Sequence, residues 1–268
     1  MKKIVFLLFL INVVFAQEEK MEILKEKLKA AKQEQKELKK EIEDIESKIP
    51  PENIFKTHFE LGYVDTNGNT NTRTFNTDLK IQKRFLDKHL LVYTFDGQYS
   101  KEDETVGKNK FLTELTYNYE MQKFWKFTYL VGYKRDKFSA FDYQFYTGPG
   151  IKYKVFKTKK QKLSIEGSVL YSVDERYVDE KSTQYASGRV KGIYSYKIID
   201  NLIFSEEASY RTDLSSTQNY FIYSVTKLTS KVYKYFSINM SYKADYVNEA
   251  NEKENLDTTF SINAVVDF

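Results

Sequence analysis

Cysteine is absent from the 268-residue chain, which excludes a disulfide framework and any metal site built from thiolates. Histidine occurs only twice, so a metal cluster or a serine–histidine catalytic site has few places to form. The formal charge of +4 is nearly balanced and offers no concentrated basic face of the kind that nucleic-acid binding needs. No nucleotide-binding loop is present in the sequence either. We therefore expect no cofactor and no nucleic-acid partner.

Long apolar runs are also missing from the sequence. No segment approaches the roughly 18 consecutive apolar residues that a membrane-spanning helix needs. The first residues, MKKIVFLLFLINVVFAQEEK, begin with two lysines and a short apolar run, and Val14-Phe15-Ala16 then precedes a polar segment. This order is typical of a secretory signal peptide cleaved after Ala16, and an uncleaved anchor is the alternative. Residues 1–16 are therefore predicted to be a signal peptide, and the mature chain to be exported.

Residues 17–49 repeat apolar side chains at alternating steps of three and four, which predicts a helix with a heptad pattern. Position a holds Met21, Leu28, Gln35, Ile42 and Ile49, and position d holds Leu24, Ala31, Leu38 and Ile45. Pro50-Pro51 ends the helix and begins a linker over residues 50–53. Isoleucine at both positions favours a trimeric coiled coil. The alternative is a single amphipathic helix that lies against another surface. The homo-oligomer contacts expected in this helix are Leu24, Leu28, Leu38, Ile42 and Ile45.

From residue 54 to residue 268 the apolar period changes to two, which is the period of a β-strand. In the last thirteen residues, LDTTFSINAVVDF, only Val265 breaks the alternation. Twelve segments with this period are predicted as strands, over residues 54–64, 75–85, 89–100, 109–121, 125–135, 143–156, 162–173, 183–198, 201–212, 218–229, 232–247 and 255–268.

The connections between these segments alternate in length. Those after the even-numbered strands are short, such as LDKH and IDN, whereas those after the odd-numbered strands are longer and more polar, such as DTNGNTN, KEDETVGK and NEANEKEN. An even number of antiparallel strands of about ten residues, with turns and loops distributed in this way, is typical of a bacterial outer-membrane β-barrel. A soluble β-sandwich is the alternative, but its strands are typically about 5–6 residues long.

The expected fold is therefore all-β, with residues 54–268 forming a closed antiparallel 12-stranded transmembrane β-barrel that follows the coiled-coil helix. The last strand must pair with the first to close the ring. The predicted location is the bacterial outer membrane, whose lipids are the expected partner, with the N-terminal helix and the C-terminus on the periplasmic side. Two places are ambiguous. Glu206-Glu207 sends one carboxylate outward unless a bulge intervenes, and either face of NYFIYSV could be the apolar one.

One face of nearly every predicted strand carries ionisable residues, and we expect this face to line the lumen because charged groups need water or partners. A water-filled pore is one interpretation, and a salt-bridged, largely closed lumen that supports the wall is the other. We expect a porin-like passive channel for ions or small polar solutes. The alternative is a non-conducting structural or adaptor barrel whose periplasmic helix mediates oligomerisation or partner binding. The predicted lumen-lining residues are Lys56, His58, Glu60, Asp78, Lys80, Arg84, Glu114, Glu120, Lys152, Glu166, Arg189 and Lys191.

An enzyme is not expected from this sequence. An outer-membrane phospholipase needs serine, histidine and a polar partner near the lipid-facing surface. His58 is predicted to point into the lumen and His89 to lie in a periplasmic turn, so neither histidine is placed for that chemistry.

Small residues are concentrated on the outward face of YASGRVKGIYSY, where Ala186, Gly188, Val190 and Gly192 alternate with inward residues. Small side chains let neighbouring walls approach closely within a membrane. Gly188 and Gly192 are therefore predicted to contribute to a contact between protomers. The alternative is that these residues only fill the lipid-facing wall.

Two motifs carry a resemblance to a known family. FELGYVDTNGNTNTRTFN resembles the opening Gly-Asn-Thr hairpin of the salt-induced outer-membrane protein family, also called domain of unknown function 481, and YTGPGIKYKVF resembles its later Gly-rich strand. The likeness covers about residues 55–268 and does not include the heptad helix. The resemblance implies a bacterial outer-membrane β-barrel without an assigned biochemical role.

Overall fold

The computed structural model describes residues 21–39, 41, 55–66, 72–176, 182–216, 218–248 and 255–268. The chain divides into two units, residues 1–51 and 52–268. The predicted signal peptide, residues 1–16, and the predicted linker, residues 50–53, lie outside the described residues.

In the first unit, residues 21–39 form an α-helix, within the range that the heptad pattern predicts. Leu24, Leu28 and Leu38 are all more than half exposed on this helix. Ile42 and Ile45 lie outside the described residues, so a coiled coil through this segment stays a prediction. Within the described part of the chain, no helix combines the length and the apolar composition needed to cross a membrane.

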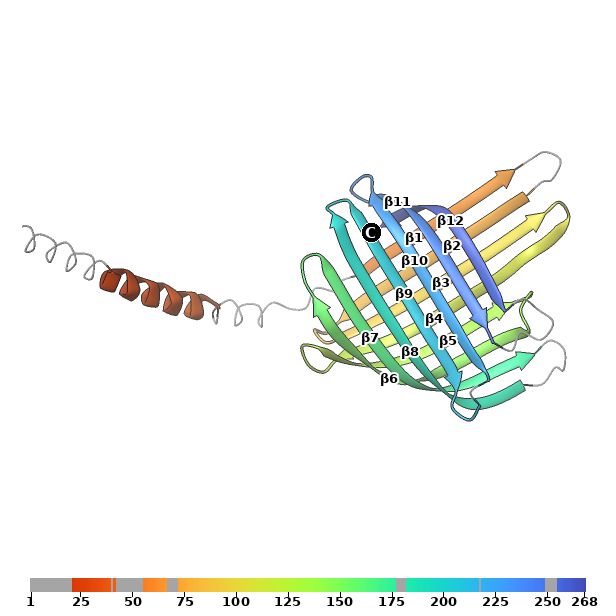
Figure 1. The fold of residues 1–268 in the computed structure, drawn as a ribbon, viewed down its shortest axis with the longest axis horizontal. Coiled ribbons are helices and arrows are strands. Elements are labelled where there is room, and N and C mark those ends of the chain that lie inside the picture. The colour runs from red at the N-terminus through yellow and green to blue at the C-terminus, as the bar shows by residue number, and fades with distance from the viewer. Residues whose placement is uncertain are drawn as a thin grey trace, which may run out of the picture. The chain divides into compact units, whose positions relative to one another are not determined.

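The second unit is a closed antiparallel barrel of twelve strands, as the period-two pattern predicts (Figure 1). Each strand pairs with its neighbours in the sequence, and β1 pairs with β12. The strands are β1 (Phe55–Thr66), β2 (Thr72–Phe85), β3 (His89–Glu102), β4 (Thr105–Glu120), β5 (Trp125–Asp136), β6 (Phe141–Lys157), β7 (Gln161–Arg176), β8 (Ser182–Ile199), β9 (Leu202–Asp213), β10 (Tyr220–Lys231), β11 (Phe236–Val247) and β12 (Leu256–Asp267).

The ring closes through the last residues of the chain. Thr57 and Phe268 exchange two backbone hydrogen bonds, of 3.0 and 2.9 Å. Val265, the residue that breaks the alternation, pairs with Glu60 and is 0% exposed on the inner face of β12. β1 and β12 pair over residues 58–61 and 264–267, and over this stretch each supplies the other's backbone partners.

The two ends of the barrel differ in their connections. We call the end that holds Phe55, Phe268 and the short connections 86–88, 121–124, 158–160, 200–201 and 232–235 the turn end, and the opposite end the loop end. The prediction of a long connection in KEDETVGK is wrong, because β3 and β4 extend to a turn of only Asp103 and Glu104. Asp103 adopts a φ of 47° there, which allows the chain to reverse within two residues.

Two further expectations at the turn end are corrected. The predicted strand 232–247 begins at Phe236, because residues 232–235 form a turn in which Val232 and Tyr233 both donate to the carbonyl of Phe236. His89 is the first residue of β3 and does not lie in a turn. Its Nδ1 lies 2.6 Å from the hydroxyl of Tyr117 on β4, so a cross-strand contact holds the ring in the sheet.

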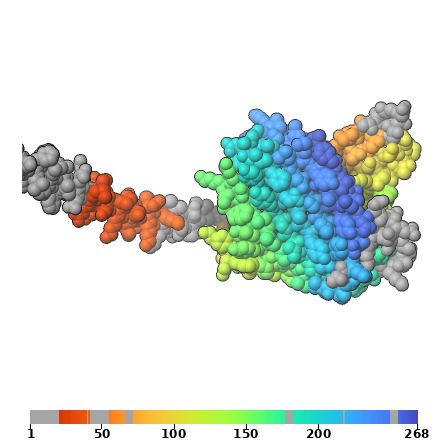
Figure 2. Space-filling model, viewed as in Figure 1, coloured from red at the N-terminus to blue at the C-terminus, as the bar shows by residue number. Residues whose placement is uncertain are grey.

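The outer wall is apolar and the inner wall is polar. Val169, Phe260 and Ile262 point outward and are each at least 60% exposed, whereas Asn239 and Ser241 point inward and are 1% exposed. In the space-filling view the strands from β7 to β12 form a continuous wall on the face that is seen (Figure 2). The barrel therefore presents apolar side chains to its surroundings and encloses polar ones.

The register settles both ambiguous places. Residues 206 and 207 pair without a bulge, so Glu207 points inward and Glu206 points outward. On the outer wall Glu206 accepts hydrogen bonds from Ser224 at 2.8 Å and Thr226 at 2.5 Å on β10. The second ambiguous place, NYFIYSV, lies at the start of β10. There Phe221 points to the inner face and Tyr220 to the outer face.

Candidate functional site: the lumen of the barrel

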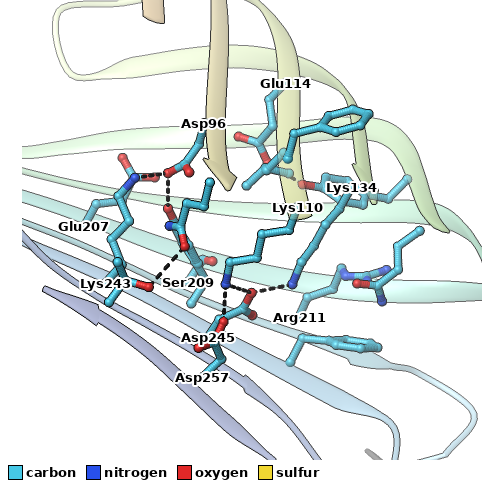
Figure 3. A pocket seen from close by; sticks show the side chains of 18 of the residues that line it. Asp96, Lys110, Glu114, Lys134, Glu207, Ser209, Arg211, Lys243, Asp245 and Asp257 are labelled. Carbon is cyan, nitrogen blue, oxygen red and sulfur yellow. Dashed lines mark hydrogen bonds and ion pairs between the residues drawn. The ribbon is translucent and has the colours of Figure 1, made fainter. Parts of the chain in front are cut away.

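The lumen contains two adjoining cavities. The turn-end cavity has a volume of about 650 Å³ and reaches from Lys56 and Phe268 to Asp96 and Tyr223. The loop-side cavity is smaller, about 80 Å³, and is shown in close-up in Figure 3. Both cavities are lined by residues that include Asp96, Leu112, Glu114, Arg189, Glu207 and Tyr223. The interior is therefore hollow and narrows toward the loop end.

Most of the predicted lumen-lining residues surround the turn-end cavity. Arg84 and Glu120 do not line it, and instead form an ion pair of 3.5 Å with each other close to the turn end. The predicted residues in the cavity wall are Lys56, His58, Glu60, Asp78, Lys80, Glu114, Lys152, Glu166, Arg189 and Lys191.

Several ion pairs cross the lumen at the loop-side cavity, and we call their residues the ion-pair belt: Lys110, Lys134, Lys243, Asp96, Asp245 and Asp257. Lys134 on β5 lies 2.6 Å from Asp245 on β11, six positions away in the ring of twelve strands. These two side chains therefore join opposite walls.

Two further pairs of the belt run beside it (Figure 3). Lys110 on β4 lies 2.5 Å from Asp257 on β12, and Lys243 on β11 lies 2.5 Å from Asp96 on β3. Each pair links strands that are four positions apart in the ring. Because an enclosed charge is stable only with a partner, the belt residues that are largely buried depend on their partners on the facing strands.

Another contact across the lumen adjoins the belt. Arg189 on β8 donates to Glu114 on β4 at 2.9 Å, and Tyr146 on β6 donates to the same carboxylate at 2.7 Å. Gly132 on β5 leaves the space that this tyrosine occupies, since a Cβ there would lie 2.2 Å from the Cε2 atom of Tyr146. The glycine therefore allows the ring of Tyr146 to pack closely against β5.

At the loop end, apolar side chains meet inside the barrel. Phe141 on β6 and Phe221 on β10 contact each other with ring centroids 5.6 Å apart, and Ala140 and Val247 complete the cluster. The guanidinium of Arg211 lies 4.3 Å from the ring centroid of Phe221. We call Ala140, Phe141, Phe221 and Val247 the loop-end cluster. It narrows the lumen further on the loop-end side.

Sequence reasoning missed the loop-end cluster. The pairing of β6 with β7 shifts register between Phe141 and Tyr143, and this irregularity turns Phe141 inward while Tyr143 remains on the outer face. A strict alternation would place Phe141 and Tyr143 on the same face. No feature of the residues alone marks the position of this bulge.

His58, near the turn end, lies between carboxylates of β1 and β12. His58 lies 2.6 Å from Glu60 through Nε2 and 2.6 Å from Asp267 through Nδ1. Lys227 also contacts Glu60, at 2.7 Å. Both ring nitrogens of His58 thus face carboxylates. Among the described residues, no group of three or more histidines, aspartates or glutamates is arranged to hold a metal ion.

The two outward glycines of β8 have different surroundings. A Cβ on Gly192 would meet nothing within 4 Å, and a Cβ on Gly188 would lie 3.1 Å from Leu214. Gly188 borders a shallow groove on the outer wall, lined also by Pro149, Gly167 and Val190. A protomer contact through Gly188 and Gly192 stays a prediction.

Comparison with solved structures finds outer-membrane barrels of low sequence identity. The NanC porin is 12% identical, with a TM-score of 0.48 over 80% of this chain and 98% of that one. An outer membrane channel from Pseudomonas putida F1 is 10% identical, with a TM-score of 0.46 over 80% and 94% of the two chains. The translocator domain of the autotransporter NalP from Neisseria meningitidis is 10% identical, with a TM-score of 0.41 over 80% and 86%. At these identities the likeness concerns the fold alone.

A search of curated proteins gave no match. The family model described as "Protein of unknown function, DUF481" matches residues 59–268, which is nearly the whole barrel. This match agrees with the resemblance of the Gly-Asn-Thr hairpin and the Gly-rich strand, and the chain belongs to that family.

Proposed function

We propose that this protein is an outer-membrane β-barrel that conducts ions or small polar solutes through a narrow, ion-paired lumen. The turn-end cavity carries the proposal, because a volume of about 650 Å³ lined by ionised side chains is stable only when it holds water. The apolar outer wall and the closed ring support the proposed location in the outer membrane. Closing the ring gives backbone groups hydrogen-bond partners within lipid, where water cannot supply them. The turn end would face the periplasm, as the short turns of such barrels do.

The expected conductance is low. A twelve-stranded ring lies between eight-stranded barrels, which side chains fill, and sixteen-stranded porins, which hold an aqueous channel. The ion-pair belt narrows the path, and the pairing of its lysines with aspartates cancels much of the field inside it. The barrel is therefore proposed to pass small solutes slowly and with weak charge selectivity.

A specific observation favours a second candidate, a non-conducting structural or adaptor barrel. The ion-pair belt and the Phe141–Phe221 contact both join walls across the lumen, and such contacts brace a barrel as well as narrow it. The helix 21–39, with its exposed leucines, would then be the part that contacts a second copy or another partner.

Planar bilayer recordings separate the two candidates. The informative variant is the double substitution Lys134→Ala and Asp245→Ala, because it removes a pair that joins opposite walls without leaving either charge unpaired. Its conductance is expected to exceed that of the wild type. The matched control is Lys197→Ala with Asp200→Ala, which removes an exposed pair beside a turn and is expected to change nothing. Silent bilayers with both the folded wild type and the belt variant would establish the non-conducting barrel instead.

A further inference from the structure

We infer that the turn-end cavity contains a binding site for a small anion that carries phosphate or carboxylate groups, formed by Lys80 on β2 and Lys152 on β6, with Lys191 on β8 beside them. All three lysines line this cavity. Binding at this site requires only that the cavity be open to solution, so it does not depend on whether the barrel conducts.

The carboxylates around the cavity already have partners. Glu60 contacts His58 and Lys227, and Glu114 contacts Arg189 and Tyr146. Glu207 pairs with Lys191. The remaining carboxylates are also engaged: Asp78 and Asp96 with Lys243, Asp267 with His58, and Glu166 with Ser168. The acidic groups thus pair with most of the cations in the cavity wall, and among the described residues they leave Lys56, at the turn end, and Lys80 without an ion pair.

Lys80 forms no ion pair and no hydrogen bond with any described residue of the barrel. Its side chain is exposed to the turn-end cavity although protein surrounds that cavity. Lys152 has a looser arrangement than the belt lysines, since the carboxylate of Glu166 is 3.9 Å from its Nζ. A lysine ammonium has three donors, and both of these lysines can turn theirs toward a bound molecule.

The lysines also act on one another. Lys80 interacts electrostatically with Lys191 and Lys227, and Lys152 interacts with Lys80 and Lys191. Glu207 lies within range of both and is held by Lys191. Since like charges in an enclosed space repel each other, an anion seated between Lys80 and Lys152 would relieve this repulsion.

The size of the cavity indicates the size of the ligand. Small-molecule sites typically have volumes of about 300–1,000 Å³, and the turn-end cavity, at about 650 Å³, falls in this range. The cavity reaches the turn end at Lys56 and Phe268, which gives the ligand a path of entry. The ion-pair belt limits it on the other side, so the site suits a compact anion and not a long polymer.

Isothermal titration calorimetry on the folded barrel in detergent tests this site, with inorganic phosphate and succinate as probes at constant ionic strength. Saturable binding of at least one probe is expected with the wild type. Lys80→Met keeps the length of the side chain but removes its charge, and it is expected to weaken binding about tenfold or more. Lys152→Met is also expected to weaken binding of the probe. Phosphate binding alone would identify a phosphate ligand, and succinate binding alone a carboxylate ligand.

The matched control is Lys83→Met, because Lys83 lies on the same strand but is exposed and does not line the cavity. It is expected to bind the probes as the wild type does. Heat modifiability on gel electrophoresis establishes that each variant is folded. The site is refuted if neither probe gives a saturable signal with the wild type, if Lys80→Met binds as well, or if Lys83→Met loses binding to the same extent. Silent bilayers together with saturable binding would contradict the proposal of a channel and still support the anion-binding site.

Discussion

At the scale of single residues, the lumen is lined by charged side chains whose partners lie on distant strands. Lys134 and Asp245 are separated by 111 residues in the sequence, and Lys110 and Asp257 by 147. Most of these side chains are enclosed by the wall, so each charge depends on one or two neighbours. A change at one partner therefore acts on the other through the unpaired charge that it leaves.

The belt should be more sensitive to single substitutions than to paired ones. Asp245→Ala leaves the ammonium of Lys134 without its closest carboxylate, and we expect it to lower the free energy of unfolding by about 2 kcal/mol. The double variant Lys134→Ala with Asp245→Ala removes both charges and should lose less. Urea unfolding in detergent measures both values. A double variant that is less stable than Asp245→Ala would contradict this account.

Glu206 is a carboxylate on the outer wall, four residues into β9 from the turn end. Its charge would face lipid, where an ionised group is unfavourable, although Ser224 and Thr226 donate to it. Glu206→Gln keeps an acceptor for these hydroxyls and removes the charge, so it should raise the free energy of unfolding by about 1 kcal/mol in lipid vesicles.

The control for this change is Glu104→Gln, because Glu104 is almost fully exposed in the turn between β3 and β4. That substitution should leave the free energy of unfolding unchanged. A destabilised Glu206→Gln protein would show instead that the charge is needed on the outer wall, through a partner other than lipid.

At the scale of elements, the barrel strands and the N-terminal helix depend on their surroundings in different ways. Each strand gains its backbone partners from two neighbours in the ring. The helix 21–39 forms its own hydrogen bonds, yet it leaves Leu24, Leu28 and Leu38 exposed. An apolar stripe of this kind favours burial against a second helix.

Self-association through the helix is therefore the prediction at this scale, with a trimer as the expected product. Replacing Leu38 and Ile42 with glutamine should lower the mass of the oligomer in native detergent measurements and leave the barrel folded. Replacing Gln33 and Glu37, which contact each other on the exposed helix surface, with alanine is the matched control. An oligomer whose mass does not respond to the leucine and isoleucine changes would favour a single helix that contacts another surface.

At the scale of the whole molecule, a polar interior inside an apolar wall specifies the environment of the chain. If water surrounded the barrel, apolar side chains of the outer wall such as Phe260 and Ile262 would be exposed to it. Lipid removes these side chains from water and leaves the lumen wet.

The purified protein should accordingly be a heat-modifiable barrel that is recovered with the outer membrane and needs detergent to stay dispersed. Circular dichroism should show dominant β-structure with a minor helical contribution, in keeping with twelve strands and one described helix. A variant cut to residues 52–268 is the control for the helical signal. A monomer that stays soluble without detergent would contradict the membrane location.

The sequence by itself determined the strands, the closed barrel and most of the lumen wall. The reason is local: a side-chain period of two assigns every second residue of a strand to one face, whatever the rest of the chain does. Lys56, Glu60 and Lys80 could be assigned to the lumen in this way. Connection lengths were less predictable, because the turn at Asp103 and Glu104 depends on how far two paired strands extend.

Only the tertiary structure decided which charges meet across the lumen and which have no ion pair among the described residues. Lys134 meets Asp245, and Lys80 meets no carboxylate of the described residues, because the register and tilt of all twelve strands set the level of each side chain. The bulge beside Phe141 likewise depends on the pairing of β6 with β7. Periodicity assigns a residue to a face, but contacts between opposite walls arise only when the ring has closed.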